Sequence, residues 1–205
     1  MVDYFPSYIF GIAAGTVSIT GFFIYIGSVV KGRTRPSGPS WWTWTLFAGI
    51  IVTSSWFAGA PWQVLILPLS LCISQFGVAL LSIKYGDNNW GLSNKIYVSS
   101  ALLAIVLWFL TGEPLIALIF SIIADFFASI PNFRHTWIYP AQENRTSWTL
   151  DWFSAILEIF TVSQWSIIES GWAIYFLLNM SVMLILVWRP SFAELSGENV
   201  LKPAD

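Results

Sequence analysis

RPSGPSWWTWTL (residues 35–46) and YPAQENRTSWTL (residues 139–150) follow one pattern at two places in the chain. In each stretch a proline, Pro36 or Pro140, is followed eight positions later by Trp-Thr-Leu. A pattern that recurs at a fixed separation indicates a structural unit that occurs more than once. The two stretches therefore predict that the regions around them share one structure.

The composition is typical of a protein with many membrane-spanning segments. Of the 205 residues, 56% are hydrophobic and 10% are charged, and the mean hydropathy is +0.69. A soluble domain carries about 25% charged residues. The composition therefore excludes an ordinary soluble domain, and the lipid bilayer is the first partner that we expect.

Seven segments are long enough to cross a bilayer as helices, because a hydrocarbon core about 30 Å thick needs roughly 17–25 helical residues. They are residues 7–30, 41–60, 62–84, 96–112, 114–130, 148–168 and 171–188. Turn-forming residues separate them at 59–62, 111–114 and 169–172. The runs are continuously apolar rather than alternating, which disfavours membrane strands. We therefore predict an all-α membrane protein with seven transmembrane helices.

The basic residues predict the orientation of these helices. All nine fall in loops on one side of the predicted membrane, at Lys31, Arg33, Arg35, Lys84, Lys95, Arg134, Arg145, Arg189 and Lys202. The other side holds Asp3, Glu113 and Glu169 and no cation. Loop cations stay on the cytoplasmic side during insertion. We expect a multi-pass protein of the cell membrane, with its N-terminus outside and its C-terminus in the cytoplasm.

A shift of 104 residues shows how far the repeat extends. It aligns eight identical pairs within 28 positions: Ile19/Ile123, Phe22/Phe126, Phe23/Phe127, Ile26/Ile130, Pro36/Pro140, Trp44/Trp148, Thr45/Thr149 and Leu46/Leu150. This composition would give roughly two identities by chance. The shift moves each of the first three spans by four spans, an even number, so both triplets point the same way through the membrane.

Two triplets that point the same way need one additional crossing between them, which the span at 96–112 supplies. The predicted order is 3+1+3: a first three-helix bundle at 1–94, a linker helix at 95–113, a second three-helix bundle at 114–188 and a cytoplasmic tail at 189–205. Repeats of this kind flank a binding site near the membrane midplane, and one bundle rocks against the other to alternate access.

This organisation resembles the SWEET and PQ-loop superfamily of transporters, whose fold the KDEL receptors share. The resemblance rests on the 3+1+3 order, the outside N-terminus and a proline-bearing loop before spans 2 and 6. A strict Pro-Gln pair is absent, because the chain has Pro36-Ser37 and Pro140-Ala141-Gln142. The resemblance implies a midplane polar amide on the third helix of each bundle. It also implies aromatic faces that sandwich the solute.

By this resemblance, Gln75 and Asn179 are the two midplane amides that contact the solute. The 104-residue shift aligns Gln75 with Asn179. Each sits near the middle of an apolar span; the alternative is that such amides hold helices together. Trp56 and its aligned partner Phe160 take the aromatic role by resemblance. Four further tryptophans start spans at the predicted cytoplasmic boundary and are expected to form an interfacial belt. They are Trp41, Trp42, Trp44 and Trp148.

Three acids lie inside predicted spans: Asp125, Asp151 and Glu158. Ionisable groups in a membrane often mark a transport pathway, and no lysine or arginine lies deep in any span to neutralise these acids. Burial favours the protonated form of a carboxyl, so we predict a proton-coupling or cation-binding role. Alternatively, each acid hydrogen-bonds a neighbouring helix, and Asp151 is also close enough to a helix start to be solvated or to cap it.

Three prolines are hinge candidates. Pro36 and Pro140 fix the backbone before a helix, and Pro131 is expected to end the span at 114–130. The alternative for all three is ordinary loop punctuation.

The function that these features favour is transport of a small polar solute by alternating access, proton-coupled or cation-accepting. A membrane receptor or interaction protein of KDEL-receptor type is the alternative. An enzyme is not expected, because the chain has no metal-ligand cluster, nucleophile motif or phosphate loop. We predict no catalytic residue, no metal, no cofactor and no nucleic-acid partner, and the sequence leaves a homo-oligomer open.

Overall fold

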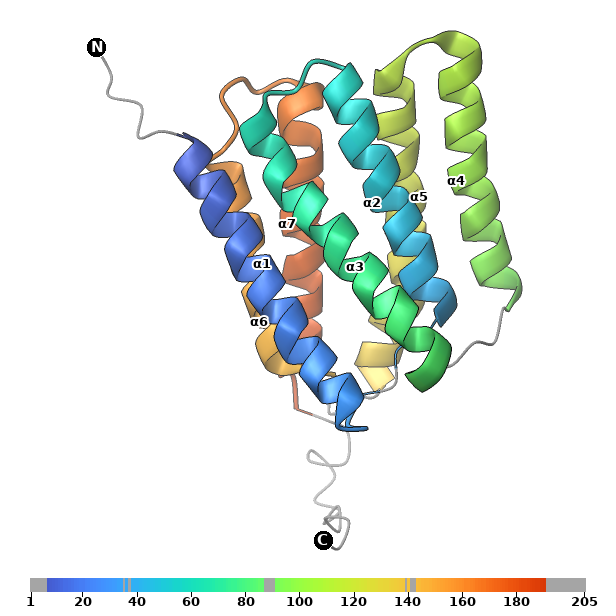
Figure 1. Cartoon of the computed structure of the whole chain (residues 1–205), viewed down its shortest axis with the longest axis vertical. Coiled ribbons are helices and arrows are strands. Elements are labelled where there is room, and N and C mark those ends of the chain that lie inside the picture. Colours follow the sequence, from blue (N-terminus) through green and yellow to red (C-terminus); the bar gives the residue numbers. More distant parts are fainter. Residues whose placement is uncertain are drawn as a thin grey trace, which may run out of the picture.

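A computed structural model describes residues 7–34, 36, 38–86, 91–138, 140 and 143–190 (Figure 1). Every regular element among these residues is a helix. The α-helices are α1 (Ser7–Val30), α2 (Gly38–Phe57), α3 (Ile66–Tyr85), α4 (Leu92–Thr111), α5 (Pro114–Ile138), α6 (Arg145–Ile159) and α7 (Ile167–Trp188), with a short 3-10 helix η1 (Trp62–Leu65) before α3. The predicted cytoplasmic tail beyond Pro190, with Asp3, Arg35 and Lys202, lies outside the described residues.

The distribution of side chains is that of a membrane protein. Four segments, namely α1, η1 with α3, α5 and α7, are long and apolar enough to cross a bilayer. Large hydrophobic side chains are exposed on all seven helices, among them Phe23, Ile83 and Phe109. Polar groups such as Glu158 and Asn179 are buried instead. Because a soluble monomer rarely exposes extended apolar patches, we conclude that this is a helical membrane protein.

α1 and α3 run side by side in the same direction and approach closely. Gly11 lies against the backbone of Gln63, and Gly15 lies against Ile66 and Ser70, so the contacts advance together along both helices. A Cβ atom added to Gly15 would be 2.7 Å from Ser70 Oγ. Small residues four positions apart let membrane helices pack at short range. The two glycines therefore set the spacing of this helix pair.

α5 and α7 form a second pair of parallel helices. Tyr175 hydrogen-bonds Asp125, and Asn179 hydrogen-bonds Ser129, so the partners again advance together. Each pair carries one reversed helix. α2 lies antiparallel to α3, where Cys72 Sγ is 3.8 Å from the Thr45 carbonyl oxygen and Trp42 contacts Phe76. α6 lies antiparallel to α7, where Trp152 donates to Ser181 and Trp188 donates to Thr149.

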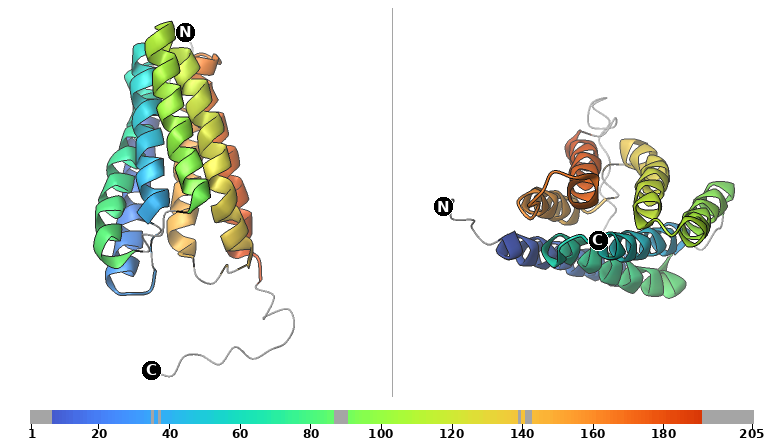
Figure 2. Two further views of the ribbon diagram at one scale, coloured as in Figure 1. Left: turned by 90° about the vertical axis from the view of Figure 1, so that its right-hand side faces the viewer. Right: turned by 90° about the horizontal axis from the view of Figure 1, so that it is seen from above.

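The helix contacts complete the arrangement. α3 contacts both α1 and α2, and α7 contacts both α5 and α6. The two groups meet where α1 packs on α6 and α2 packs on α5, whereas α4 packs on α5 and α2 at the edge of the bundle (Figure 2). α1 and α6 are antiparallel, because Ser18 pairs with Asp151 and Phe10 with Phe160. α1, α3, α5 and α7 therefore share one direction.

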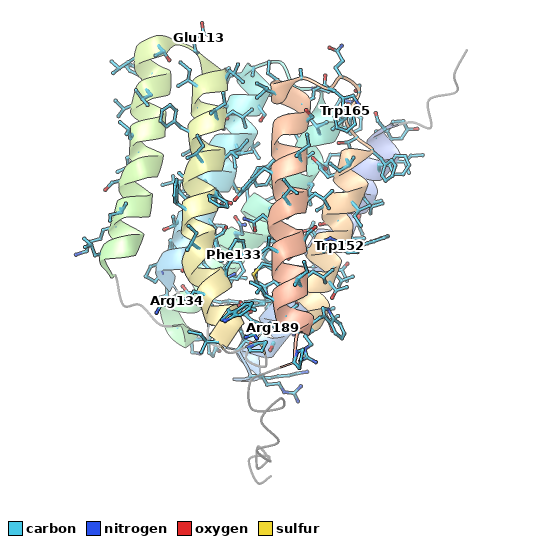
Figure 3. The ribbon with its side chains drawn as sticks, turned by 180° about the vertical axis from the view of Figure 1, so that it is seen from behind. Glu113, Phe133, Arg134, Trp152, Trp165 and Arg189 are labelled. Carbon is cyan, nitrogen blue, oxygen red and sulfur yellow. The ribbon has the colours of Figure 1, made fainter. Side chains whose placement is uncertain are left out.

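The described cations gather at one end of the bundle, where the acid Glu143 also lies. The described cations lie at the end where α1 and α7 finish, and Figure 3 shows Arg134 and Arg189 there. They are Lys31, Arg33, Lys84, Lys95, Arg134, Arg145 and Arg189. Glu113, which precedes α5, lies at the opposite end. The orientation of these two ends in a membrane stays a prediction.

The prediction that Pro131 ends a helix is wrong. α5 passes through Pro131 and continues to Ile138. Proline removes one helical hydrogen bond, but membrane helices tolerate it because neighbouring groups satisfy the freed backbone. As a result Arg134 lies on the last turns of α5 rather than in a loop.

The predicted boundary between the last two helices is also wrong. α6 ends at Ile159 and α7 begins at Ile167, so the break lies at 160–166 rather than at 169–172. Ser166 Oγ accepts a hydrogen bond from Glu169 N–H at 3.4 Å, and Glu169 Oε2 accepts from the backbone N–H groups of Ser163 and Gln164 at 3.0 Å. Ser-x-x-Glu is a helix-start pattern, so these side chains fix the start of α7.

Changing Ser166 to alanine is expected to destabilise the protein, because the first turn of α7 loses its capping oxygen. Loss of an N-cap costs about 0.5–2 kcal/mol. Ser163→Ala is the matched control, since only the backbone N–H of Ser163 takes part in the cap. Unfolding of the purified protein in detergent measures both variants. Equal stabilities for the two would show that Ser166 does not hold the helix start.

Candidate functional site

A cavity of about 60 Å³ lies between the two groups of helices. Residues of α1, α2, α3, α5, α6 and α7 line it. Its polar lining consists of Gln75, Asp125, Ser129, Asn132, Ser147, Asp151 and Asn179. A buried site needs about 10–15 Å³ of such volume to hold one water molecule. The cavity therefore has room for a few water molecules or for a small polar group.

Gln75 and Asn179 both line this cavity, from α3 and α7. Their bonding differs. Asn179 Nδ2 donates to Ser129 Oγ and to Tyr175 Oη, both at 2.9 Å. Gln75 Oε1 is buried and has no hydrogen-bond partner within the described part of the chain. An unpaired buried acceptor is costly, so Gln75 lines the cavity with an amide group that the described residues leave unsatisfied.

Asp125 belongs to a network that joins α5 to α7. Tyr175 Oη donates to Asp125 Oδ2, and Ser129 Oγ donates to the Asp125 carbonyl oxygen at 3.0 Å. Asp125 and Ser129 lie one turn apart on α5, and Tyr175 and Asn179 lie one turn apart on α7. Sequence reasoning missed Tyr175. The available signal was its position four residues before Asn179, which puts both side chains on one helix face.

Asp151 lines the cavity from α6 and is buried, so it is neither solvated at the interface nor part of a helix cap. Ser18 Oγ on α1 donates to Asp151 Oδ1 at 3.1 Å, which ties α6 to α1. Asp151 Oδ2 receives no hydrogen bond from the described residues. Asp151 and Asp125 thus bring carboxyl groups to the cavity from both α6 and α5.

Glu158 does not line the cavity with the other two acids. It lies two turns beyond Asp151 on α6, about 10 Å along the helix axis at 1.5 Å per residue. Its side chain is 0% exposed, and neither carboxyl oxygen has a hydrogen-bond partner among the described residues. Glu158 is therefore a separate buried acid, close to the end of the bundle where α6 finishes.

The structure does not bring Trp56 and Phe160 into the cavity. Their side chains are 60% and 56% exposed, and Phe160 stacks on Phe10 with ring centroids 5.2 Å apart. Trp56 and Phe160 each follow a cavity residue, Trp44 or Trp148, by twelve positions. Twelve residues rotate a helix face by about 120°. Both candidates therefore point to the outside of the bundle.

The tryptophans expected to form a belt supply the cavity's aromatic lining instead. Trp41, Trp44 and Trp148 line the cavity, and Trp41 is only 6% exposed. Trp41 and Trp44 lie 5.4 Å apart with an interplanar angle of 89°. Burial therefore contradicts the belt assignment for Trp41, whereas for the partly buried Trp44 and Trp148 it stays a prediction. Trp172 and Phe176 on α7, which sequence reasoning missed, line the opposite wall with ring centroids 5.3 Å apart.

Pro36 and Pro140 are both buried at the cation-bearing end. The carbonyl oxygen of Pro36 lies against Gly86, where a Cβ atom would approach it to 2.6 Å. The loop before α2 therefore packs directly on the end of α3. The hinge role of these prolines stays a prediction.

No family model, curated protein or solved structure matches this chain. The side chains around the cavity define what it can do chemically. They offer carboxyl groups from Asp125 and Asp151, amide groups from Gln75, Asn132 and Asn179, and aromatic faces. Such a lining can bind a small polar solute reversibly.

Proposed function

We propose that this protein is a membrane transporter that moves a small polar solute by alternating access. The observation that carries the proposal is the position of the cavity. Six helices from both halves of the chain line it, and Gln75, Asn179, Asp125 and Asp151 bring polar groups to it inside an otherwise apolar bundle. Polar groups in this setting mark a solute pathway.

The helix directions support the 3+1+3 architecture. α1, α3, α5 and α7 share one direction, so each helix between them returns toward the starting side, and the proposal counts seven crossings, of which the 15-residue α6 is the shortest. In this reading α1, α3 and α2 form one bundle, α5, α7 and α6 form the other, and α4 links them. The same order underlies the resemblance to SWEET and PQ-loop transporters. Parallel repeats of this kind place substrate at the interface between the bundles.

The charges at the bundle ends support an orientation. The end that carries Lys31, Arg33, Lys84 and Arg145 faces the cytoplasm, because short basic loops stay on that side. Glu113 and Glu169 then face outward. The N-terminus is outside, and the loops that precede α2 and α6 are cytoplasmic.

The proposed transport cycle opens the cavity to one side at a time. The two bundles meet through α1 on α6 and through α2 on α5. A small rotation of one bundle against the other separates these contacts at one end and tightens them at the other, as in other repeat-built carriers.

Uptake by proteoliposomes tests the proposal. Purified protein is first screened by thermal shift against sugars, amino acids, vitamins and cations, and the stabilising solutes are then supplied in labelled form to loaded vesicles. We expect saturable uptake with exchange of internal solute, and loss of uptake in Gln75→Leu. Protein-free vesicles and Gln164→Ala, a change of an exposed amide, are the controls. Solute binding without any uptake would contradict transport and favour the receptor alternative.

A further inference from the structure

The charge that lines the cavity has one sign. Asp125 and Asp151 contribute carboxyl groups, and no lysine, arginine or histidine is among the described residues that line the cavity. Each carboxyl accepts one side-chain hydrogen bond, from Tyr175 and from Ser18, which leaves its second oxygen without a described partner. Carboxyl groups inside a membrane are stabilised by a partner of opposite charge.

A third polar group lines the same space. Gln75 comes from α3, and its Oε1 is buried without a described partner, whereas Asp125 and Asp151 come from α5 and α6. Two carboxyl groups and one amide group from three helices therefore line the cavity. A solute that brings several N–H donors, or a positive charge, suits the two carboxyl groups, whereas a solute with its own carboxylate would be repelled.

The aromatic rings complement these oxygens. Trp41 and Trp44 stand almost perpendicular to one another at 89°, so their faces point in different directions. Phe22 meets Trp41 at 76°, and Trp172 and Phe176 stack at 18° on the α7 side. Rings at steep angles around a small space form the kind of aromatic cage that binds quaternary ammonium groups, because each ring face attracts a cation within about 6 Å.

We propose that the transported solute is a small organic cation that carries an ammonium group. This inference rests on the proposed function and adds the solute class. Asp125, Asp151 and Gln75 hold the positive charge, and the rings of Trp41, Trp44 and Trp172 surround its alkyl substituents. A neutral sugar would not balance the charge of two carboxyl groups, and a bare metal ion would not pack its own alkyl groups against the aromatic rings. The cavity of about 60 Å³ limits the charged group to a small one.

A pair of solutes with the same shape and different charge tests the inference. Titration calorimetry on the full chain in detergent compares choline with 3,3-dimethylbutan-1-ol, in which a carbon atom replaces the charged nitrogen. Methylammonium, tetramethylammonium and guanidinium extend the panel, and potassium and calcium chloride test bare ions. We expect at least one organic cation to bind, and choline to bind at least about tenfold more tightly than its neutral analogue.

Two variants connect binding to the cavity. Asp151→Asn is expected to weaken binding of the organic cation about tenfold or more, and Trp44→Leu by about tenfold. Glu113→Gln and Trp165→Leu are matched controls, since both side chains are exposed at the far end of the bundle (Figure 3). If Asp151→Asn does not fold, two other comparisons test the inference: binding of choline by Trp44→Leu against the wild type, and binding of choline against its neutral analogue by the wild type.

Three outcomes would overturn the inference: equal binding of choline and its neutral analogue, binding of bare metal ions that Trp44→Leu leaves unchanged, or no binding by any organic cation. These outcomes leave the proposed function standing if vesicles still take up another solute in a Gln75-dependent way. Failure of all uptake would remove the proposed function itself.

Discussion

Replacing Glu158 by methionine is expected to stabilise the folded protein and to remove its response to a proton gradient. Both carboxyl oxygens of Glu158 are buried without a described partner. Such a group lowers stability by about 1–3 kcal/mol relative to a side chain that needs no hydrogen bond. Methionine has a similar length and flexibility and needs no partner. The free energy of unfolding should therefore rise by about 1–3 kcal/mol, measured by tryptophan fluorescence in detergent.

Glu158→Gln addresses the transport half of this prediction, because it keeps the shape of the side chain and removes its proton chemistry. In proteoliposomes with an imposed pH gradient, the wild type is expected to accumulate solute, whereas Glu158→Gln should only equilibrate it. Exchange of solute without a gradient should persist in both. Glu113→Gln is the control, since Glu113 is an exposed acid outside the cavity.

The result that would contradict a proton role is accumulation by Glu158→Gln at the wild-type level. Uptake by the wild type that only equilibrates the solute, with or without the pH gradient, would exclude coupling altogether and leave facilitated transport. A loss of stability in Glu158→Met would show that the carboxyl has a structural partner. The prediction for stability and the prediction for transport can therefore be contradicted separately.

Gln75 and Asn179 are expected to respond differently to substitution although they occupy aligned positions. Gln75→Leu should abolish solute binding without lowering stability, because Gln75 Oε1 has no described partner to lose and is itself costly to bury unpaired. Asn179→Leu should abolish binding and also destabilise the protein by about 1–3 kcal/mol. Its removal leaves Tyr175 and Ser129 without the amide that donates to them.

Thermal unfolding and solute-induced thermal shift, measured side by side, separate these two effects. Gln164→Ala is again the exposed-amide control. Equal destabilisation by Gln75→Leu and Asn179→Leu would show that Gln75 has a structural role like that of Asn179. Solute binding by Gln75→Leu at the wild-type level would remove Gln75 from the site.

Much of the fold and part of the site can be predicted from the sequence, because a polar group in an apolar run is conspicuous. Residues such as Gln75, Asp125 and Asn179 stand out against their neighbours, and all three line the cavity. The apolar runs also predict the helices, since the bilayer fixes their length. The start of α7 was missed because the run that contains Ser166 and Glu169 stays apolar on both sides of the break.

The aromatic side chains could not be predicted in the same way. Tryptophan and phenylalanine suit lipid, interface and interior alike, so their presence in a span does not indicate which way they point. Trp44 and Trp56 lie on one helix, yet the first lines the cavity and the second is exposed. Only the rotation of α2 against its neighbours distinguishes them, and that rotation depends on contacts with helices far along the chain.

The two same-direction helix pairs resist change in different ways. Gly11 and Gly15 join α1 to α3 by the absence of side chains, so that pair tolerates polarity changes nearby but no added bulk. Tyr175 and Asn179 join α7 to α5 by specific bonds, so that pair tolerates changes of bulk around it but no lost donor. One pair can thus serve as a close-packed frame while the other carries the polar chemistry of the cavity.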